Sequence, residues 1–284
     1  MSSRREIPRT VAVVPRVRDA VCDSAGRSSP LLPTGVLLLS FLFSTAVSAA
    51  DAKVASNAPG AVGLDSDPHL VGWWKFDEAS GKRAADSSKH SHDGTLEGSL
   101  SFDTHSAPGR SGKAVRLEGN NDCIRMAGFK GVIGTQPRTV AAWIKTPAGE
   151  GDLTTWGTND HGQMWIFGHI RGRIGVTPKG GYLYMKAGTD DDAWHHVAVV
   201  VREASPPNLH DDVKLFRDGE LAEIDDIGLL DLWPIETGDQ QDVCVGRRFK
   251  GLIDDLRIYD RALSEDEVKA LFKLEGDRPL PQAK

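Results

Sequence analysis

The 284-residue sequence predicts an all-β fold, a two-sheet antiparallel jelly-roll sandwich with one short C-terminal helix. From His69 onward, apolar runs of strand length, rich in Val, Ile, Trp and Tyr, alternate with Gly, Asp, Asn and Pro. Only one segment, near the C-terminus, has the apolar spacing of a helix, and no internal repeat is visible. About 200 residues of this kind predict one domain rather than two.

The first 50 residues have the form of a secretory signal peptide. Arginines from Arg4 to Arg27 precede the stretch LLPTGVLLLSFLFSTAVSAA, which ends in small residues that suit signal peptidase. An uncleaved anchor is the alternative, but the apolar run is short for a bilayer span. We therefore expect a secreted, periplasmic or cell-surface protein without membrane contact after signal cleavage.

Three further boundaries follow from composition. Residues 51–68 are small, polar and Pro/Gly-bearing, which predicts a linker. The strand-rich domain covers residues 69–274. Residues 275–284 are polar and Pro-interrupted, which predicts a flexible tail.

Two local signals fix the ends of particular elements. In LSEDEVKALFKLE, Ser264 and Glu267 form a capping box at the start of the helix, and Leu263 and Val268 suit a hydrophobic staple around it. Asp218-Gly219, between two short apolar runs, predicts a tight β-hairpin because both residue types tolerate positive φ angles.

Charge and cysteine content set limits on the class of protein. The formal net charge of −6, without a basic stripe, argues against a nucleic-acid partner. Cys22 lies in the leader, which leaves Cys123 and Cys244. A Cys123–Cys244 disulfide, favoured by export, and two buried thiols are both open, because sequence does not supply the Cα separation.

Five segments in order carry a resemblance to a known family: WWKFDEASGKRAADSSKHSHDGTL, GRSGKAVRLEGNNDCIRM, RTVAAWIKT, DAWHHVAVVV with KLFRDGEL, and FKGLIDDLRIYDRALSEDEVKALF. Together they resemble LamG-like jelly-roll domains of the concanavalin A-like lectin/glucanase superfamily. The resemblance spans most of residues 69–274. It implies two antiparallel sheets stacked face to face, and it does not by itself name a ligand.

Catalysis is disfavoured by what the sequence lacks. His195 and His196 are neighbours in a predicted strand, so their side chains point to opposite faces and do not converge on one ion. Glucanases that share the fold carry the pattern E-x-D-x-x-E, and retaining hydrolysis needs two carboxylates about 5 Å apart. Here the nearest match is incomplete, with Glu223 and Asp225 followed by Gly228.

The resemblance implies a structural calcium where the opening loop meets the last strand. Asp86 and Asp254 occupy the matching positions, and Asp93 is a further oxygen source for an ion that takes six to eight oxygen ligands. The alternative is that Asp86 caps a turn through neighbouring backbone groups and that Asp254 bonds Arg257 or a nearby N–H.

The densest set of ligand-binding side chains lies in TTWGTNDHGQMWIFGHIRGR. Saccharide sites combine aromatic rings with polar groups, and we expect Trp156, Asn159, Asp160 and His161 to lie on a loop. Trp165 and His169 share a face of the next strand and are further candidates, although core packing is the stronger alternative for Trp165.

These observations favour an exported, non-catalytic carbohydrate-binding module. Its partner would be a polysaccharide or a glycoprotein glycan. A protein-interaction or structural module that binds an extracytoplasmic protein is the alternative, and a glycoside hydrolase or polysaccharide lyase is less favoured.

Overall fold

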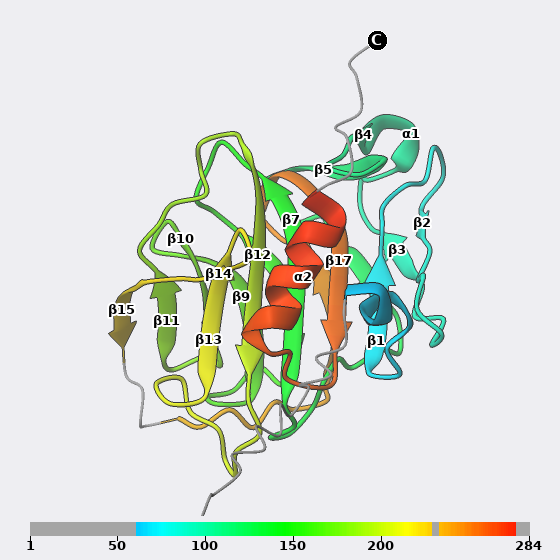
Figure 1. Ribbon diagram of the computed structural model, residues 1–284. Helices are drawn as coiled ribbons and strands as arrows, with labels where there is room; N and C mark the ends of the chain where they lie inside the picture. The colour runs from blue at the N-terminus through cyan, green and yellow to red at the C-terminus, as the bar shows by residue number, and fades with distance from the viewer. Residues whose placement is uncertain (1–60, 229–232, 277–284) are drawn as a thin grey trace, which may run out of the picture. The chain divides into compact units, whose positions relative to one another are not determined.

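The structure, a computed structural model, describes residues 61–228 and 233–276 and confirms the predicted sandwich of two antiparallel sheets (Figure 1). Sheet A contains β14 (Glu220–Leu221), β13 (Val213–Arg217), β12 (Trp194–Val201), β7 (Arg138–Lys145), β17 (Lys250–Tyr259), β5 (Lys113–Glu118) and β4 (Ser106–Pro108), with β1 (Leu70–Trp74) also paired to β17. Sheet B contains β15 (Ile224–Gly228), β11 (Tyr182–Met185), β10 (Arg173–Thr177), β9 (Met164–Ile170), β8 (Asp152–Gly157), β16 (Gln241–Val245), β6 (Ile124–Met126), β3 (Gly94–Leu96) and β2 (Arg83–Ala84).

The central strands of sheet A are buried on both faces. Their inner side chains pack against sheet B in the main core, whereas outer side chains of β7, β12 and β17 form a second apolar cluster with the helix α2 (Glu265–Gly276). The helix crosses the outer face of these strands (Figure 1). This explains the near-continuous apolar sequence of β12, because a strand covered on both sides does not alternate between apolar and polar residues.

The helix begins as the sequence predicts. The Ser264 N–H donates to the Glu267 carboxylate at 2.8 Å, and the Glu267 N–H donates to Ser264 Oγ at 3.2 Å, which is the reciprocal capping box. Leu263 and Val268 are both buried, as a staple requires. The Asp218-Gly219 turn is also confirmed, with φ angles of 53° and 79° between β13 and β14. A one-turn helix, α1 (Phe102–His105), has no counterpart in the prediction.

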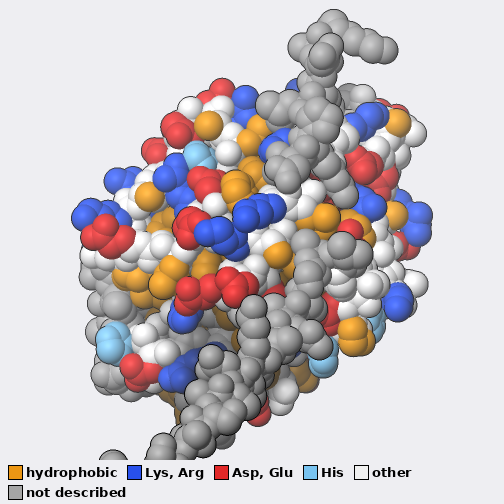
Figure 2. All heavy atoms as spheres, in the orientation of Figure 1, with side chains coloured by type: hydrophobic (Ala, Val, Ile, Leu, Met, Phe, Trp, Pro, Cys, Tyr) orange, Lys and Arg blue, Asp and Glu red, His pale blue; other side chains and the backbone are white. Residues whose placement is uncertain are grey.

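Ion pairs attach the outer surface of α2 to sheet A. Lys214 of β13 lies 2.7 Å from Glu265, and Lys269 pairs with Glu220 of β14. On the face shown in Figure 2, acidic and basic side chains are interspersed, so charge acts here through local pairs. No helix among the described residues has the length and apolarity that crossing a membrane requires.

The boundary between linker and domain needs a correction. The 3-10 helix η1 (Ala61–Ser66) precedes β1, and its Leu64 is fully buried in the cluster beneath α2. Residues 61–68 therefore belong to the domain rather than to the linker. The predicted signal peptide with Cys22, the linker residues before 61 and the tail after Gly276 lie outside the described residues.

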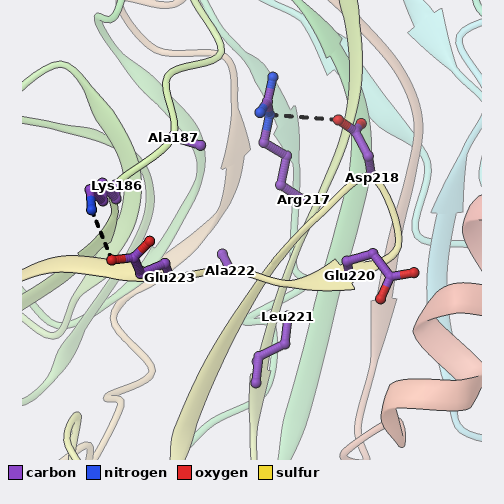
Figure 3. A pocket seen from close by; sticks show the side chains of 8 residues that line it. All are labelled: Lys186, Ala187, Arg217, Asp218, Glu220, Leu221, Ala222 and Glu223. Atoms are coloured by element: carbon purple, nitrogen blue, oxygen red, sulfur yellow. Dashed lines mark hydrogen bonds and ion pairs between the residues drawn. The ribbon is translucent and has the colours of Figure 1, made fainter.

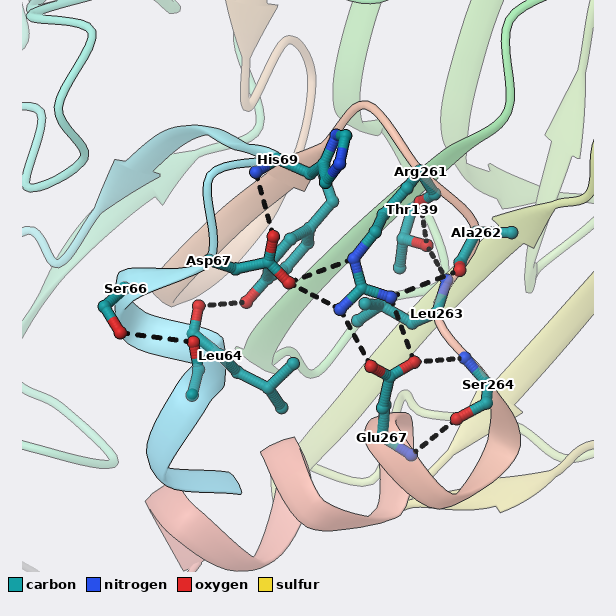
Figure 4. Close-up of polar contacts among 12 residues, drawn as sticks. Leu64, Ser66, Asp67, His69, Thr139, Arg261, Ala262, Leu263, Ser264 and Glu267 are labelled. Carbon is teal, nitrogen blue, oxygen red and sulfur yellow. Dashed lines mark hydrogen bonds and ion pairs between the residues drawn. The ribbon is translucent and has the colours of Figure 1, made fainter. Parts of the chain in front are cut away.

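Two arginines join this N-terminal segment to the C-terminal part of the chain. Arg261 donates to Asp67 at 3.0 Å and to Glu267 of α2 at 2.8 Å (Figure 4). Arg257 in β17 is fully buried, pairs with Asp65, and lies over the Trp73 ring at 4.0 Å. The first and last elements are thus held by charge as well as by apolar contact.

Removing the buried cation tests this junction. We expect Arg257→Met to lower the free energy of unfolding by about 3 kcal/mol, because Asp255, which is also buried, would lose its nearby cation. Arg116→Met is the matched control, since Arg116 and Glu118 form a half-exposed pair worth about 1 kcal/mol or less. Urea denaturation measures both variants; equal losses would contradict the assigned role of Arg257.

Acid should weaken the Arg261 network. Burial alone would raise the pKa of Asp67 and of Glu267, but hydrogen bonds from Arg261 outweigh burial and leave both pKa values below their usual range. Such carboxylates stabilise the fold above their unfolded-state pKa, and that stability is lost as pH falls through the folded value. We expect Tm to fall below about pH 4 and to fall less steeply in Arg261→Met. Melting curves across this pH range provide the test, and parallel slopes would contradict it.

Candidate functional site

The two predicted tryptophans of sheet B lie in the core. Trp156 and Trp165 are fully buried on β8 and β9, and their rings stack with centroids 5.3 Å apart. The Trp156 indole N–H donates to the Val132 carbonyl at 3.1 Å. The expectation that Trp156 lies on a loop is therefore wrong, and for Trp165 the structure favours the core alternative. Neither ring reaches the surface where a ligand could contact it.

The other three residues of this group do lie on the loop between β8 and β9. Asn159, Asp160 and His161 are exposed there. Lys179 Nζ donates at 2.9 Å to both the backbone oxygen and the side-chain oxygen of Asn159. The His161 backbone N–H donates to the Asp160 carboxylate at 2.7 Å, which holds the pKa of Asp160 below its usual range.

The exposed aromatic ring of this region is Trp233, which the sequence analysis missed. It is 39% exposed, and its ring centroid lies 4.7 Å from that of His161. Gly180 makes the contact possible: its φ angle is +106°, and a Cβ there would lie 2.6 Å from His161 Cδ2 and 2.7 Å from Trp233 Cδ1. We call Asn159, Asp160, His161, Lys179 and Trp233 the Trp233 surface.

Backbone hydrogen bonds fix the loops that carry this surface. The Gly162 N–H donates to the Lys179 carbonyl at 3.0 Å, and the Glu236 N–H donates to the Gly162 carbonyl at 2.9 Å. Gly134 and Thr237 pair nearby, beside Ile133, which is 46% exposed. An exposed ring beside an amide, a carboxylate and an ammonium can stack on an apolar face of a ligand while hydrogen bonding to its hydroxyls.

His169 does not join this surface. It lies near the C-terminal end of β9, whereas the 158–163 loop precedes the N-terminal end of that strand. The structure thus divides the predicted ligand residues into a buried pair, a loop cluster and a histidine at the other end of the sheet.

The predicted calcium residues accept hydrogen bonds from groups of the protein. Both oxygens of Asp86 are used: Oδ1 accepts from the Trp73 and Ser88 N–H groups, and Oδ2 accepts from Ser88 Oγ and the His92 N–H, all at 2.7–2.9 Å. Asp93 accepts from the Asp86 N–H at 2.9 Å.

The third predicted ligand, Asp254, is fully buried in β17 and accepts from the Ser111 N–H at 3.0 Å. Within residues 61–228 and 233–276, no three His, Cys, Asp or Glu side chains gather closely enough to hold a metal ion. Asp86 matches the turn-capping alternative, and a calcium ion bound by Asp86, Asp93 and Asp254 stays a prediction.

Of the two alternatives left open for Cys123 and Cys244, the structure matches the pair of buried thiols. Cys123 and Cys244 are free buried thiols beside β6 and in β16. A hydrogen bond from Cys123, together with Arg247, lowers the pKa of the Cys244 thiol, whereas the same contact raises that of Cys123. Arg247 Nη2 lies 3.8 Å from Cys244 Sγ, so a cation and a thiol, rather than a covalent bond, stabilise this sulfur.

The paired histidines have separate structural roles, as their alternation predicts. His195 bonds the carboxylates of Asp218 at 2.9 Å and Asp191 at 3.1 Å. His196 faces the opposite side, beneath α2, where its ring packs on Trp143 and Phe272. Burial lowers the pKa of His196 to about 3, so it is neutral at neutral pH.

The incomplete glucanase pattern lies at an exposed edge. Glu223 forms an ion pair with Lys186 at 2.9 Å beside a pocket of about 310 Å³ that residues 186–187, 217–218 and 220–223 line (Figure 3). Arg217 and Asp218 face each other at 3.6 Å in the same pocket. Asp225 is exposed on the edge strand β15, and Gly228 contributes no carboxylate. This segment therefore lacks the second carboxylate of its pattern.

Comparisons with known proteins agree with the fold. Residues 118–269 match a family model for laminin G domains, described as the concanavalin A-like lectin/glucanases superfamily. No curated protein matches the sequence.

Solved structures are similar to this chain to different degrees. Domain 4 of AbnA, a GH43 extracellular arabinanase from Geobacillus stearothermophilus in complex with arabinotriose, is 22% identical with a TM-score of 0.52, and the match covers 71% of this chain and 97% of that domain. The binding domain of Paraclostridial Mosquitocidal Protein 1 is 18% identical with a TM-score of 0.48, and the match covers 72% of this chain and 52% of that one. The chain thus spans nearly all of the first structure and about half of the second.

Removing calcium distinguishes the two alternatives for Asp86, a calcium ligand or a turn cap. If its oxygens act only as acceptors of N–H and O–H groups, Tm should be the same in calcium and in EDTA, and Asp86→Asn should lower it under both conditions. Differential scanning calorimetry measures both effects. A Tm several degrees higher in calcium, lost in Asp86→Asn, would restore the calcium site.

Proposed function

Because the chain belongs to the concanavalin A-like lectin/glucanases superfamily, we propose that it is an exported, non-catalytic carbohydrate-binding module whose ligand contacts the Trp233 surface. The observation that carries the proposal is the exposed Trp233 ring, held against His161 and surrounded by polar side chains. Export itself rests on the N-terminal sequence, which has the form of a signal peptide.

The chemistry of the surface suits a saccharide. The Trp233 ring offers a flat apolar face for the C–H groups of a sugar, while Asn159, Asp160 and Lys179 offer both donors and acceptors for its hydroxyls. The ring is held by its packing on His161 and by the close approach of Gly180. A ring fixed before binding loses little conformational entropy when the ligand arrives.

The arabinanase domain supports the same ligand class. It has this fold over nearly its whole length and is in complex with arabinotriose. We carry over the class, a neutral saccharide, and no particular residue or sugar, because identity is 22%. A non-catalytic role agrees with the absence of the second carboxylate at Gly228 and with the structural contacts of His195 and His196.

The test combines a glycan and polysaccharide array with one substitution. We expect saturable binding of the full chain to one glycan class, and at least a tenfold loss in Trp233→Ala, which corresponds to about 1.4 kcal/mol. Leu221→Ala is the matched control, because Leu221 is an exposed apolar residue, 51% accessible, on an edge strand of sheet A. The control should bind as the unaltered protein does.

Each other outcome corrects a different part of the proposal. Unchanged binding in Trp233→Ala would place the glycan elsewhere on the protein. If the protein bound no glycan on the array, a protein partner would be favoured. Exposed Trp233 and Ile133 at one end of the sandwich would then be the contact residues.

A further inference from the structure

A second pocket, of about 310 Å³, lies at the other end of β8 and β9 from the Trp233 surface. It forms where three chain segments meet, at residues 149–152, 169–172 and 248. Glycines allow the close approach: a Cβ on Gly149 would lie 2.7 Å from the Gly172 carbonyl oxygen, and one on Gly151 would lie 2.2 Å from the Arg248 backbone. The pocket is lined by Gly149, Glu150, Gly151, Asp152, His169, Arg171, Gly172 and Arg248.

A buried carboxylate forms part of the pocket wall. Asp152, the first residue of β8, is 9% exposed, and burial raises its pKa. Its nearest cation, Arg248 Nη2, lies 3.7 Å from Oδ2, which is longer than a hydrogen bond. The Arg248 side chain is itself 64% exposed. Asp152 therefore keeps acceptor capacity that neighbouring protein groups do not fill.

A half-buried imidazole lines the pocket next to this carboxylate. His169 Nδ1 is buried and has no hydrogen-bond partner, whereas Nε2 lies 3.3 Å from Thr189 Oγ1. Burial lowers the pKa of His169 to about 4, so the ring is neutral at neutral pH. The Glu150 and Gly151 backbone oxygens face the ring and offset part of this lowering, and Nδ1 is closed off from solvent. The imidazole is therefore an uncharged wall of the pocket.

The charges around the pocket narrow the class of ligand. Arg171 and Arg248 are opposed by Glu150 and Asp152, and Asp190 lies near His169. An anionic ligand would face two or three carboxylates, and a cationic ligand would face two guanidinium groups. A neutral ligand with several hydroxyls avoids both penalties, because each hydroxyl donates one hydrogen bond and accepts others.

We propose that this pocket is a second saccharide site, which holds a hydroxyl of a neutral sugar between Asp152 and Arg248, beside the uncharged ring of His169. The hydroxyl donates to the Asp152 carboxylate and accepts from Arg248. The ligand class rests on the proposed function, whereas the location rests on this pocket alone.

Two sites would make the module bivalent. The pocket begins at Asp152 and the Trp233 surface follows Gly157, so the length of β8 separates them by about 20 Å at about 3.3 Å per residue. That distance lets one protein contact two polysaccharide chains, or two stretches of one chain. Bivalent attachment raises the apparent affinity for a polymer without raising it for a single sugar.

The test is a titration of the ¹⁵N-labelled full chain with methyl glycosides of glucose, galactose and arabinose, with glucuronate as the charged comparison. We expect the amide signals of Gly149, Gly151 and Gly172 to shift with a neutral sugar. These shifts should persist in Trp233→Ala and weaken at least tenfold in Asp152→Asn, which removes the charge at nearly constant size.

Arg248→Gln provides an independent variant, because this exposed side chain can be changed without disturbing the core, and Arg116→Gln on sheet A is the matched control. Tighter binding of glucuronate than of every neutral sugar would overturn the assigned ligand class. Shifts confined to the Trp233 indole would overturn the second site and leave the proposed function intact. Shifts at the pocket glycines without any at Trp233 would support the pocket and contradict the Trp233 surface, and shifts at neither would contradict both.

Discussion

The buried arginine of β17 is the contact on which the rest of the structure depends. Arg257 is fully buried between Asp65, Asp255 and the Trp73 ring, so it joins the segment before β1 to the last long strand of the chain. Neighbouring Arg261 extends the junction to α2 through Asp67 and Glu267. A charge buried in this way is stabilised only while all its partners are in place, which couples the two ends of the domain.

That junction places α2 over the outer face of sheet A and leaves sheet B to carry the candidate sites. β7, β12 and β17 are covered on both faces and have no room for a ligand on the sheet. The exposed chemistry lies instead in the loops at the two ends of β8 and β9, where a rigid sheet holds variable connections. Gly180 at one end, and Gly149 and Gly151 at the other, bring loops together more closely than any Cβ would allow.

The sequence predicts what depends on local or periodic patterns. The capping box of Ser264 and Glu267 and the Asp218-Gly219 turn involve residues within four positions of each other, and the structure confirms both. The loop expectation for Trp156 failed because its neighbours Thr154, Thr155 and Gly157 form no apolar pattern, although the structure buries every residue of β8.

Contacts between distant parts of the chain explain the remaining differences between the sequence-based expectations and the structure. The Trp233 surface requires residues 161, 180 and 233 to come into contact, and no local sequence pattern predicts this contact. Composition marks Asp86 as a potential oxygen ligand, but only the fold shows that four N–H and O–H donors already surround its carboxylate. The signal that could have found Trp233 was its position beside Pro234 between two strands, where a large aromatic residue has no strand to bury it.

The distance between the two proposed sites determines how they act together. Sites separated by the length of a strand, without shared side chains, contribute to free energy almost independently, since coupling is strong mainly between residues in contact or in one network. Asp152 and Trp233 belong to different loop clusters at the two ends of the paired strands β8 and β9. A monosaccharide in one site should therefore leave the other unchanged. Any gain from having both must come from the polymer, because a chain held at one end of the sheet has a raised local concentration at the other.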